Sequence, residues 1–266
     1  MKNSETEITD TDNNNVKCLF SQVFNQKIKG KPDYIYNNSV ITNEFFDFEV
    51  CKTILEYAAP DSDIIDIGAN IGLVTLGIKR ILELNNATNY VNKFHCFECN
   101  DDTFSYLKYN TDTHKDIILY NFGLSDVPQI AKMEINSYNY GCNMIKEIYD
   151  NSNNGVEILE YDFQKKNNPP TITEKKMFIS LMPLDLFYNV FEKKISAIKI
   201  DVEGMEYKVL LGAKNLIEKH KPAIVVEIFD ENIVKINDLM KSYNYINKGL
   251  IPKKYISQDY LFTYSG

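Results

Sequence analysis

The chain has 266 residues, enough for one large α/β domain or two small ones with a sizeable core, and one domain is favoured. Its formal net charge of −8 argues against a general electrostatic attraction to nucleic acid phosphates or to an anionic membrane, although a local basic patch would still be compatible with it. The cysteines are odd in number and scattered, which is not the pattern of a disulfide framework and favours a reducing compartment. They are Cys18, Cys51, Cys96, Cys99 and Cys142.

The first 60 residues precede the regular part of the pattern. Residues 1–15 are polar, without apolar periodicity and without the apolar segment of a signal peptide, so we expect a disordered tail. No later stretch approaches the length of a membrane span, and we therefore expect a soluble, cytoplasmic protein. Residues 16–60 are expected to form a helical extension packed on the core, and residues 61–266 the main domain.

From Asp63 onwards, apolar runs alternate with turns and amphipathic stretches. This alternation predicts an α/β fold with a doubly wound, mostly parallel sheet, helices on both faces and an antiparallel C-terminal strand pair. Residues 128–180 interrupt it with two β-like runs, at 130–135 and 177–182, and are interpreted as an insertion in the same domain. The expected strands cover 64–67, 94–98, 117–122, 197–200, 223–228, 243–246 and 260–263, and the expected helices cover 71–84, 101–110, 183–191, 207–220 and 231–242.

A run of small residues follows the first of these strands. Small residues at a sharp strand-to-helix turn let the backbone approach a ligand closely. The spacing is not the Gly-x-Gly-x-x-Gly of a nicotinamide or flavin site, which argues against a pyrophosphate ligand, and an Asp on the strand suits a cation such as the ammonium group of S-adenosylmethionine (SAM). An ordinary tight turn is the alternative. The candidate cofactor-binding residues here are Asp66, Gly68, Ala69, Asn70 and Gly72.

Two further candidates for cofactor binding follow the next strands. Glu98 ends the second strand, where doubly wound folds place an acid against ribose hydroxyls; a solvated charge at a strand end would give the same residue. Gly123 and Leu124 follow the third strand, and their backbone could line an adenine slot, although a plain turn has the same composition.

The fourth strand leads into a cluster of acids, Lys199-Ile-Asp-Val-Glu-Gly-Met-Glu206. Asp201 and Glu203 are two residues apart, so on a continued strand they share one face and could orient a substrate hydroxyl and receive its proton. Glu206 begins a helix, where the dipole favours an anion in any case. Glu227 ends the fifth strand and could contact the acceptor or a divalent cation, or be structural.

Other chemically capable side chains have weaker patterns. Cys96 and Cys99 match a Cys-x-x-Cys spacing, but the second half of a zinc site is missing and Cys96 falls inside a strand, so a buried thiol is expected. His95, His114 and His220 are dispersed and form no nucleophile motif, and we expect them to be structural or exposed.

Taken together, the sequence resembles the FkbM family of SAM-dependent methyltransferases over about residues 45–264. The resemblance is strongest in DIIDIGANIGL at 63–73, FHCFECND at 94–101 and ISAIKIDVEGMEYKVLLGA at 195–213, and KPAIVVEI at 221–228 is similar to the following strand of the family. The chain differs from the family in having Cys99 where Pro is common and Gly123 where Ala is typical.

The resemblance implies a class I methyltransferase fold that usually methylates a hydroxyl group on a sugar or natural product. By the same resemblance, Asp201 and Glu203 belong to the reacting site. The residues that it implies for SAM are Asp66, Gly68, Asn70, Gly72 and Glu98.

The leading hypothesis is therefore SAM-dependent O-methylation of a sugar, glycan or related small molecule, with a carboxylate of Asp201 or Glu203 assisting proton removal. One alternative is a methyltransferase that acts on RNA or protein, and the acidic charge argues against RNA. Another is a non-catalytic subunit with a methyltransferase-like fold. A metal-assisted reaction through Asp201, Glu203 and Glu227 with Mg²⁺ or Ca²⁺ is a further alternative, but no metal site is assigned.

Overall fold

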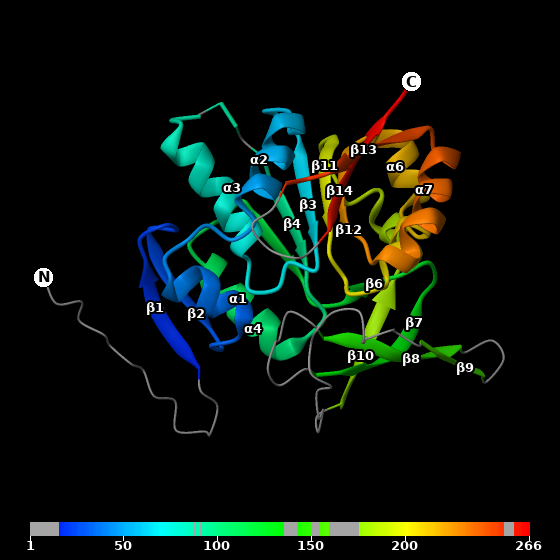
Figure 1. Ribbon diagram of the computed structural model, residues 1–266, viewed down its shortest axis with the longest axis horizontal. Coiled ribbons are helices and arrows are strands. Elements are labelled where there is room, and N and C mark those ends of the chain that lie inside the picture. Colours follow the sequence, from blue (N-terminus) through cyan, green and yellow to red (C-terminus); the bar gives the residue numbers. More distant parts are fainter. Residues whose placement is uncertain are drawn as a thin grey trace, which may run out of the picture.

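A seven-stranded sheet forms the centre of the protein (Figure 1), as seen in a computed structural model that describes residues 16–87, 89–90, 92–135, 143–150, 155–159, 176–252 and 258–266. The strand order is β13-β14-β12-β11-β3-β4-β5, parallel except at the β14 and β13 edge. This confirms the predicted fold class with its antiparallel C-terminal pair. The strands are β3 (Asp63–Ile67), β4 (Phe94–Phe97), β5 (Ile117–Tyr120), β11 (Ile195–Ile200), β12 (Ala223–Glu227), β13 (Tyr245–Leu250) and β14 (Asp259–Tyr264).

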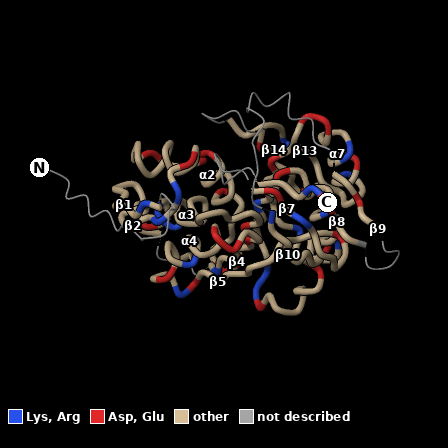
Figure 2. The backbone as a smooth tube through the Cα atoms, turned by 90° about the horizontal axis from the view of Figure 1, so that it is seen from below, with Lys and Arg blue, Asp and Glu red and all other residues tan. Residues whose placement is uncertain are grey.

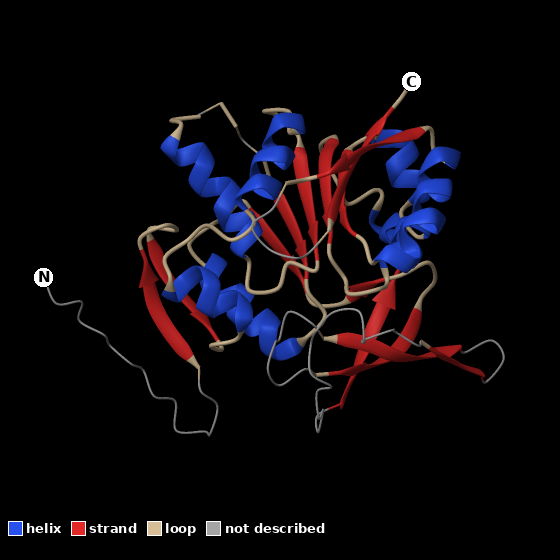
Figure 3. Cartoon of the chain, viewed as in Figure 1, coloured by secondary structure: helices blue, strands red, loops and turns tan. Residues whose placement is uncertain are grey.

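Helices cover both faces of this sheet (Figure 3), because successive strand residues point to opposite faces and both sets are apolar. In β3, Ile64 packs in one buried cluster and Ile65 in a different one, on the opposite face of the sheet. No helix in the described part of the chain has the length and apolar composition that a membrane span requires. The longer helices are α2 (Phe48–Tyr57), α3 (Leu73–Leu84), α4 (Asp101–Thr111), α5 (Glu206–Leu211), α6 (Lys214–His220) and α7 (Ile233–Ser242).

Two expected helices differ from the structure. The helix predicted over 207–220 is divided into α5 and α6 at Gly212, where an added Cβ would lie 1.9 Å from the Ser125 carbonyl oxygen. The helix predicted over 183–191 is only a 3-10 turn, η4 (Leu184–Phe187). This turn is tied to the start of α6, because the Asp185 carboxylate accepts hydrogen bonds from two backbone N–H groups there.

The N-terminal extension begins with a β-hairpin, so the expectation of a helical segment over 16–60 is wrong for its first part, whereas the residues from 34 onwards include short helical turns and α2. Five-residue runs are too short to give a helical stripe, and in β2 the fully buried Ile28 alternates with more exposed lysines. Ile28 packs with Tyr36 and with Leu73 at the start of α3. The elements are β1 (Lys17–Ser21), β2 (Gln26–Gly30), α1 (Tyr34–Tyr36) and η1 (Asn37–Ile41), followed by α2.

A second sheet of five strands, in the order β6-β10-β7-β8-β9, is formed by the insertion together with its flanking residues, because β6 precedes residue 128 and β10 extends past residue 180. It lies beyond the carboxyl ends of the central strands (Figure 1), and its buried residues Ala131 and Leu181 share a core cluster with Met205 and Val209 next to the central sheet. The two β-like runs correspond to β7 and β10, whereas β8 and β9 were not predicted. The strands are β6 (Gly123–Leu124), β7 (Gln129–Glu134), β8 (Met144–Asp150), β9 (Gly155–Ile158) and β10 (Lys176–Met182).

Basic and acidic residues lie interspersed along the described backbone (Figure 2). The predicted tail at 1–15 and the rest of the insertion are outside the described residues. The proposed domain boundaries stay predictions.

Candidate functional site

The turn between β3 and α3 has an unusual backbone. Gly68, Asn70 and Gly72 have φ values of +78°, +52° and +92°, in the left-handed region that favours glycine and tolerates asparagine. An added Cβ at Gly68 would lie 1.8 Å from the carbonyl oxygen of Asp201, so only glycine allows β3 and β11 to meet this closely. The backbone N–H groups of Gly68 and Ala69 both donate to the Phe97 carbonyl at 3.0 Å. The turn therefore joins the carboxyl ends of three strands.

Glu98 lies directly beside this turn. Its carboxylate accepts the backbone N–H of Asn70 at 3.0 Å through one oxygen and that of Asn100 at 2.8 Å through the other. Burial raises the pKa of Glu98 to about 7, even though these hydrogen bonds favour the ionised form. Each carboxylate oxygen has a second lone pair, so the group can still accept hydrogen bonds from a ligand. The predicted ribose contact is compatible with this position.

Asp66 is buried beneath the turn, on the side of the sheet that faces α3. One carboxylate oxygen accepts the Thr75 hydroxyl at 2.7 Å, and the other is buried without a hydrogen-bond partner among the described residues. Burial raises the pKa of Asp66, although the nearby Lys199 ammonium opposes the shift. Its predicted contact with the aminoacyl end of a cofactor stays a prediction.

Gly123 and Leu124 form β6, which pairs with β10. An added Cβ at Gly123 would lie 2.5 Å from the Leu181 side chain and 3.4 Å from the Cβ of Cys99. Gly123 is therefore close to the residue that follows Glu98. Leu124 is 3% exposed and packs in the core, so only its backbone is available for the predicted adenine slot.

Three carboxyl groups gather at the ends of β11 and β12. Asp201, Glu203 and Glu227 each offer an oxygen, and these oxygens lie within 4.8 Å of one another. The two predicted catalytic residues are thus brought together, with Glu227 as a third member. Burial raises the pKa of Glu227 well above its ordinary value, and the nearby Asp201 raises it further. Carboxylate oxygens at this spacing suit a hard cation such as Mg²⁺, so the metal-assisted alternative stays a prediction.

Lys199 is a residue of this site that the sequence analysis did not single out. It is 2% exposed, and its ammonium lies 3.0 Å from a carboxylate oxygen of Asp201. Burial by itself would lower the pKa of Lys199, but Asp201, Asp66 and Asp259 raise it overall, so the side chain is a cation. The spacing of Lys199 and Asp201 could have indicated this contact, because residues two apart on a buried strand share a face.

Glu206 is at the start of α5, as predicted, and is 2% exposed. It accepts the backbone N–H of Gly204 at 2.8 Å. Burial raises its pKa to about 7. This contact ties the side chain of Glu206 to the backbone of the turn after Glu203, so Glu206 has at least a structural role there.

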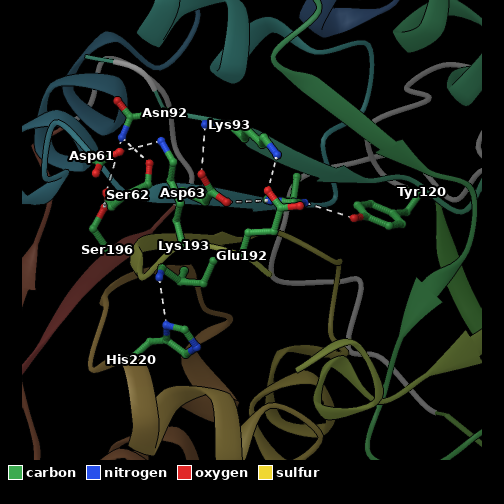
Figure 4. Close-up of polar contacts among 12 residues, drawn as sticks. Asp61, Ser62, Asp63, Asn92, Lys93, Tyr120, Glu192, Lys193, Ser196 and His220 are labelled. Atoms are coloured by element: carbon green, nitrogen blue, oxygen red, sulfur yellow. Dashed lines mark hydrogen bonds and ion pairs between the residues drawn. The ribbon is translucent and has the colours of Figure 1, made fainter. Parts of the chain in front are cut away.

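His95 and His220 make polar contacts away from the glycine turn, and Figure 4 shows Asp63 and Tyr120, the partners of His95, together with His220. The His95 ring lies 3.2 Å from the Asp63 carboxylate and 3.1 Å from the Tyr120 hydroxyl. His220 accepts the backbone N–H of Ile195 at 3.0 Å. Both histidines therefore hold structure together. Cys96 is fully buried, as expected, and burial raises the pKa of its thiol.

The strand order, the helices on both faces and the glycine turn after β3 together define a class I methyltransferase fold. The sequence model of the methyltransferase FkbM domain matches residues 66–246, which is more than half of the chain. The chain belongs to the FkbM methyltransferase family.

Solved structures of several methyltransferases resemble the chain. The methyltransferase FkbM from Methylobacillus flagellatus is 16% identical with a TM-score of 0.47, and the match covers 82% of this chain and 55% of that one. The chain thus spans little more than half of that protein. The precorrin-6y C5,15-methyltransferase from Geobacter metallireducens is 10% identical with a TM-score of 0.39, covering 81% and 86% of the two chains. A fibrillarin/Nop5p complex is 11% identical with a TM-score of 0.44, covering 84% and 85%. No curated protein matches the sequence.

Proposed function

We propose that this protein binds SAM at the glycine turn and transfers its methyl group to a hydroxyl oxygen of a sugar, glycan or related small molecule. Membership of the FkbM family supports methyl transfer. The observation that carries the choice of a hydroxyl acceptor is the trio of carboxyl groups from Asp201, Glu203 and Glu227, whose oxygens lie within 4.8 Å of one another. Gly68 touches the backbone of Asp201, so this trio adjoins the turn.

The turn and its surroundings fit SAM. Gly68 presents bare backbone where a side chain would be excluded, which lets a ligand lie against the turn. Glu98 would accept hydrogen bonds from the ribose hydroxyls. The nearby acids outnumber the buried Lys199, and this balance favours a ligand that carries a positive charge. When bound, SAM supplies an electrophilic methyl group.

The carboxyl trio would orient the acceptor and take its proton. With SAM held at the turn, a carboxylate of this trio would take the proton that the acceptor hydroxyl loses as its oxygen is methylated. Alignment of the two reactants would supply most of the rate. The base contributes a smaller factor, on the order of 100-fold.

Two measurements test the proposal. Titration calorimetry should detect SAM binding to the wild type and weaker binding to Glu98→Gln, with Glu83→Gln on the exposed side of α3 as a matched control. Labelled SAM should then transfer methyl groups to hydroxyl-bearing glycans or small molecules. Label that enters only RNA or protein would replace the proposed acceptor, and absence of SAM binding would favour a non-catalytic subunit.

A further inference from the structure

Lys199 and Asp201 form an ion pair next to the cofactor turn. The ammonium of Lys199 lies 3.0 Å from the Asp201 carboxylate, and Lys199 is paired in register with Asp66 on the neighbouring strand. The backbone N–H of Asp201 donates to the carbonyl of Ile67, and its own carbonyl touches Gly68. The pair is therefore fixed to the same backbone that the turn uses.

This position matters because the methyl donor and its product differ by one charge. SAM carries a sulfonium cation, whereas S-adenosylhomocysteine carries a neutral thioether and is otherwise almost the same molecule. Any fixed charge beside the turn therefore changes the affinity for SAM without an equal change for the product. In the wild type, the ammonium of Lys199 offsets the carboxylate of Asp201, which would otherwise attract the sulfonium.

We propose that Lys199 sets the preference of this site for SAM over its demethylated product by neutralising Asp201 beside the glycine turn. The inference rests on the proposed binding of SAM and adds to it a residue that determines specificity. Lys199 acts through electrostatics and not through contact with the ligand, since its side chain is 3% exposed and directed to Asp201.

Opposite substitutions should change the preference in opposite directions. The quantity to measure is the ratio of the dissociation constants for S-adenosylhomocysteine and SAM, by titration calorimetry at about pH 8. A unit charge within several ångströms of a ligand, at the effective dielectric of a protein, changes affinity on the order of tenfold. Lys199→Met should raise the ratio by about that factor, and Asp201→Asn should lower it by about the same factor.

The double variant provides the sharpest comparison. Lys199→Met with Asp201→Asn removes both charges while preserving approximate volume, so the ratio should return close to the wild-type value. Lys93→Met is the matched control, because Lys93 pairs with Glu192 at 2.9 Å near the opposite end of the sheet. Its ratio should equal that of the wild type.

A merely structural role for Lys199 predicts something different. Structural damage would weaken both ligands together and leave the ratio unchanged in every variant, which would overturn the inference. If Lys199→Met does not fold, the other two variants still test the inference. The ratio of dissociation constants should fall in Asp201→Asn and return to the wild-type value in the double variant. A wild type that binds neither ligand would instead refute the proposed function.

Discussion

Replacing Gly68 by alanine should disrupt both stability and cofactor binding, and Gly249 offers a matched control. Both glycines have positive φ, +78° and +102°, so alanine at either position incurs a backbone cost of about 1–2 kcal/mol. At Gly249 nothing lies within 4 Å of the added Cβ. At Gly68 the Cβ would lie 1.8 Å from the Asp201 carbonyl oxygen, and a clash of this kind adds about 1–3 kcal/mol.

Gly68→Ala should therefore lower the free energy of unfolding by about 2–5 kcal/mol and Gly249→Ala by about 1–2 kcal/mol. Urea unfolding with an unchanged m-value measures the difference. Titration calorimetry should show loss of SAM binding only in Gly68→Ala, because relief of the clash separates β3 from β11. Two outcomes would refute the conclusion that glycine is required at position 68 because β3 and β11 approach closely. These are equal destabilisation of the two variants and full SAM affinity in Gly68→Ala.

Three further outcomes follow from named side chains. Because burial raises the pKa of Glu98 to about 7, the fraction of its carboxylate form grows as the pH rises. SAM affinity by calorimetry should therefore increase from about pH 6 to about pH 8 in the wild type and increase less in Glu98→Gln, in which Glu206 still titrates; an equal increase in both would contradict the role of Glu98. Glu203→Gln should lower methyl transfer at saturating SAM on the order of 100-fold in a labelled-SAM assay, a larger loss than the roughly tenfold change in SAM affinity that removal of a nearby charge can cause; an unchanged rate would remove Glu203 from the reaction. Asp63→Asn should reduce the free energy of unfolding by about 1.5–3 kcal/mol. Burial would raise the pKa of Asp63, but hydrogen bonds from His95 and from the Lys93 backbone outweigh it and leave the pKa below its ordinary 3.8. The stabilisation is therefore present above pH 3.8 and disappears as the pH falls through the folded-state pKa. A difference in unfolding free energy between wild type and variant that stays constant down to about pH 2 would contradict this.

The features that the sequence predicted depend on local pattern. The strands of the central sheet are continuous apolar runs because both faces are covered, and the turn at Gly68 and the acids at Asp201 directly follow such runs. Chain order along a doubly wound sheet then places Glu98 beside the turn. Their adjacency could therefore be inferred before any distance was available.

The features that it missed depend on how the chain packs in three dimensions. The break at Gly212 comes from the approach of Ser125, 87 residues earlier, and no local pattern encodes that contact. The ion pair of Lys199 depends on which way a long side chain extends from a buried strand. In β8 a register shift interrupts the alternation that would mark a half-buried strand.

Buried acids whose pKa is raised gather at the carboxyl ends of the central strands. Asn70 and Glu203 at this end have positive φ, +52° and +51°, but non-glycine residues with positive φ also occur elsewhere, among them Lys221 just before β12. Burial raises the pKa of Glu98 and Glu206 at these carboxyl ends, which means that their ionised forms are disfavoured there. At the amino ends of the strands, burial would raise the pKa of Asp63, but its hydrogen bonds lower the pKa overall. A fold selected for stability alone would not gather buried carboxyl groups whose ionisation is unfavourable. A site that binds a cation recovers part of this free energy when its ligand is present. The difference in carboxyl pKa values between the two ends of the strands thus supports a cationic ligand at the glycine turn independently of any motif.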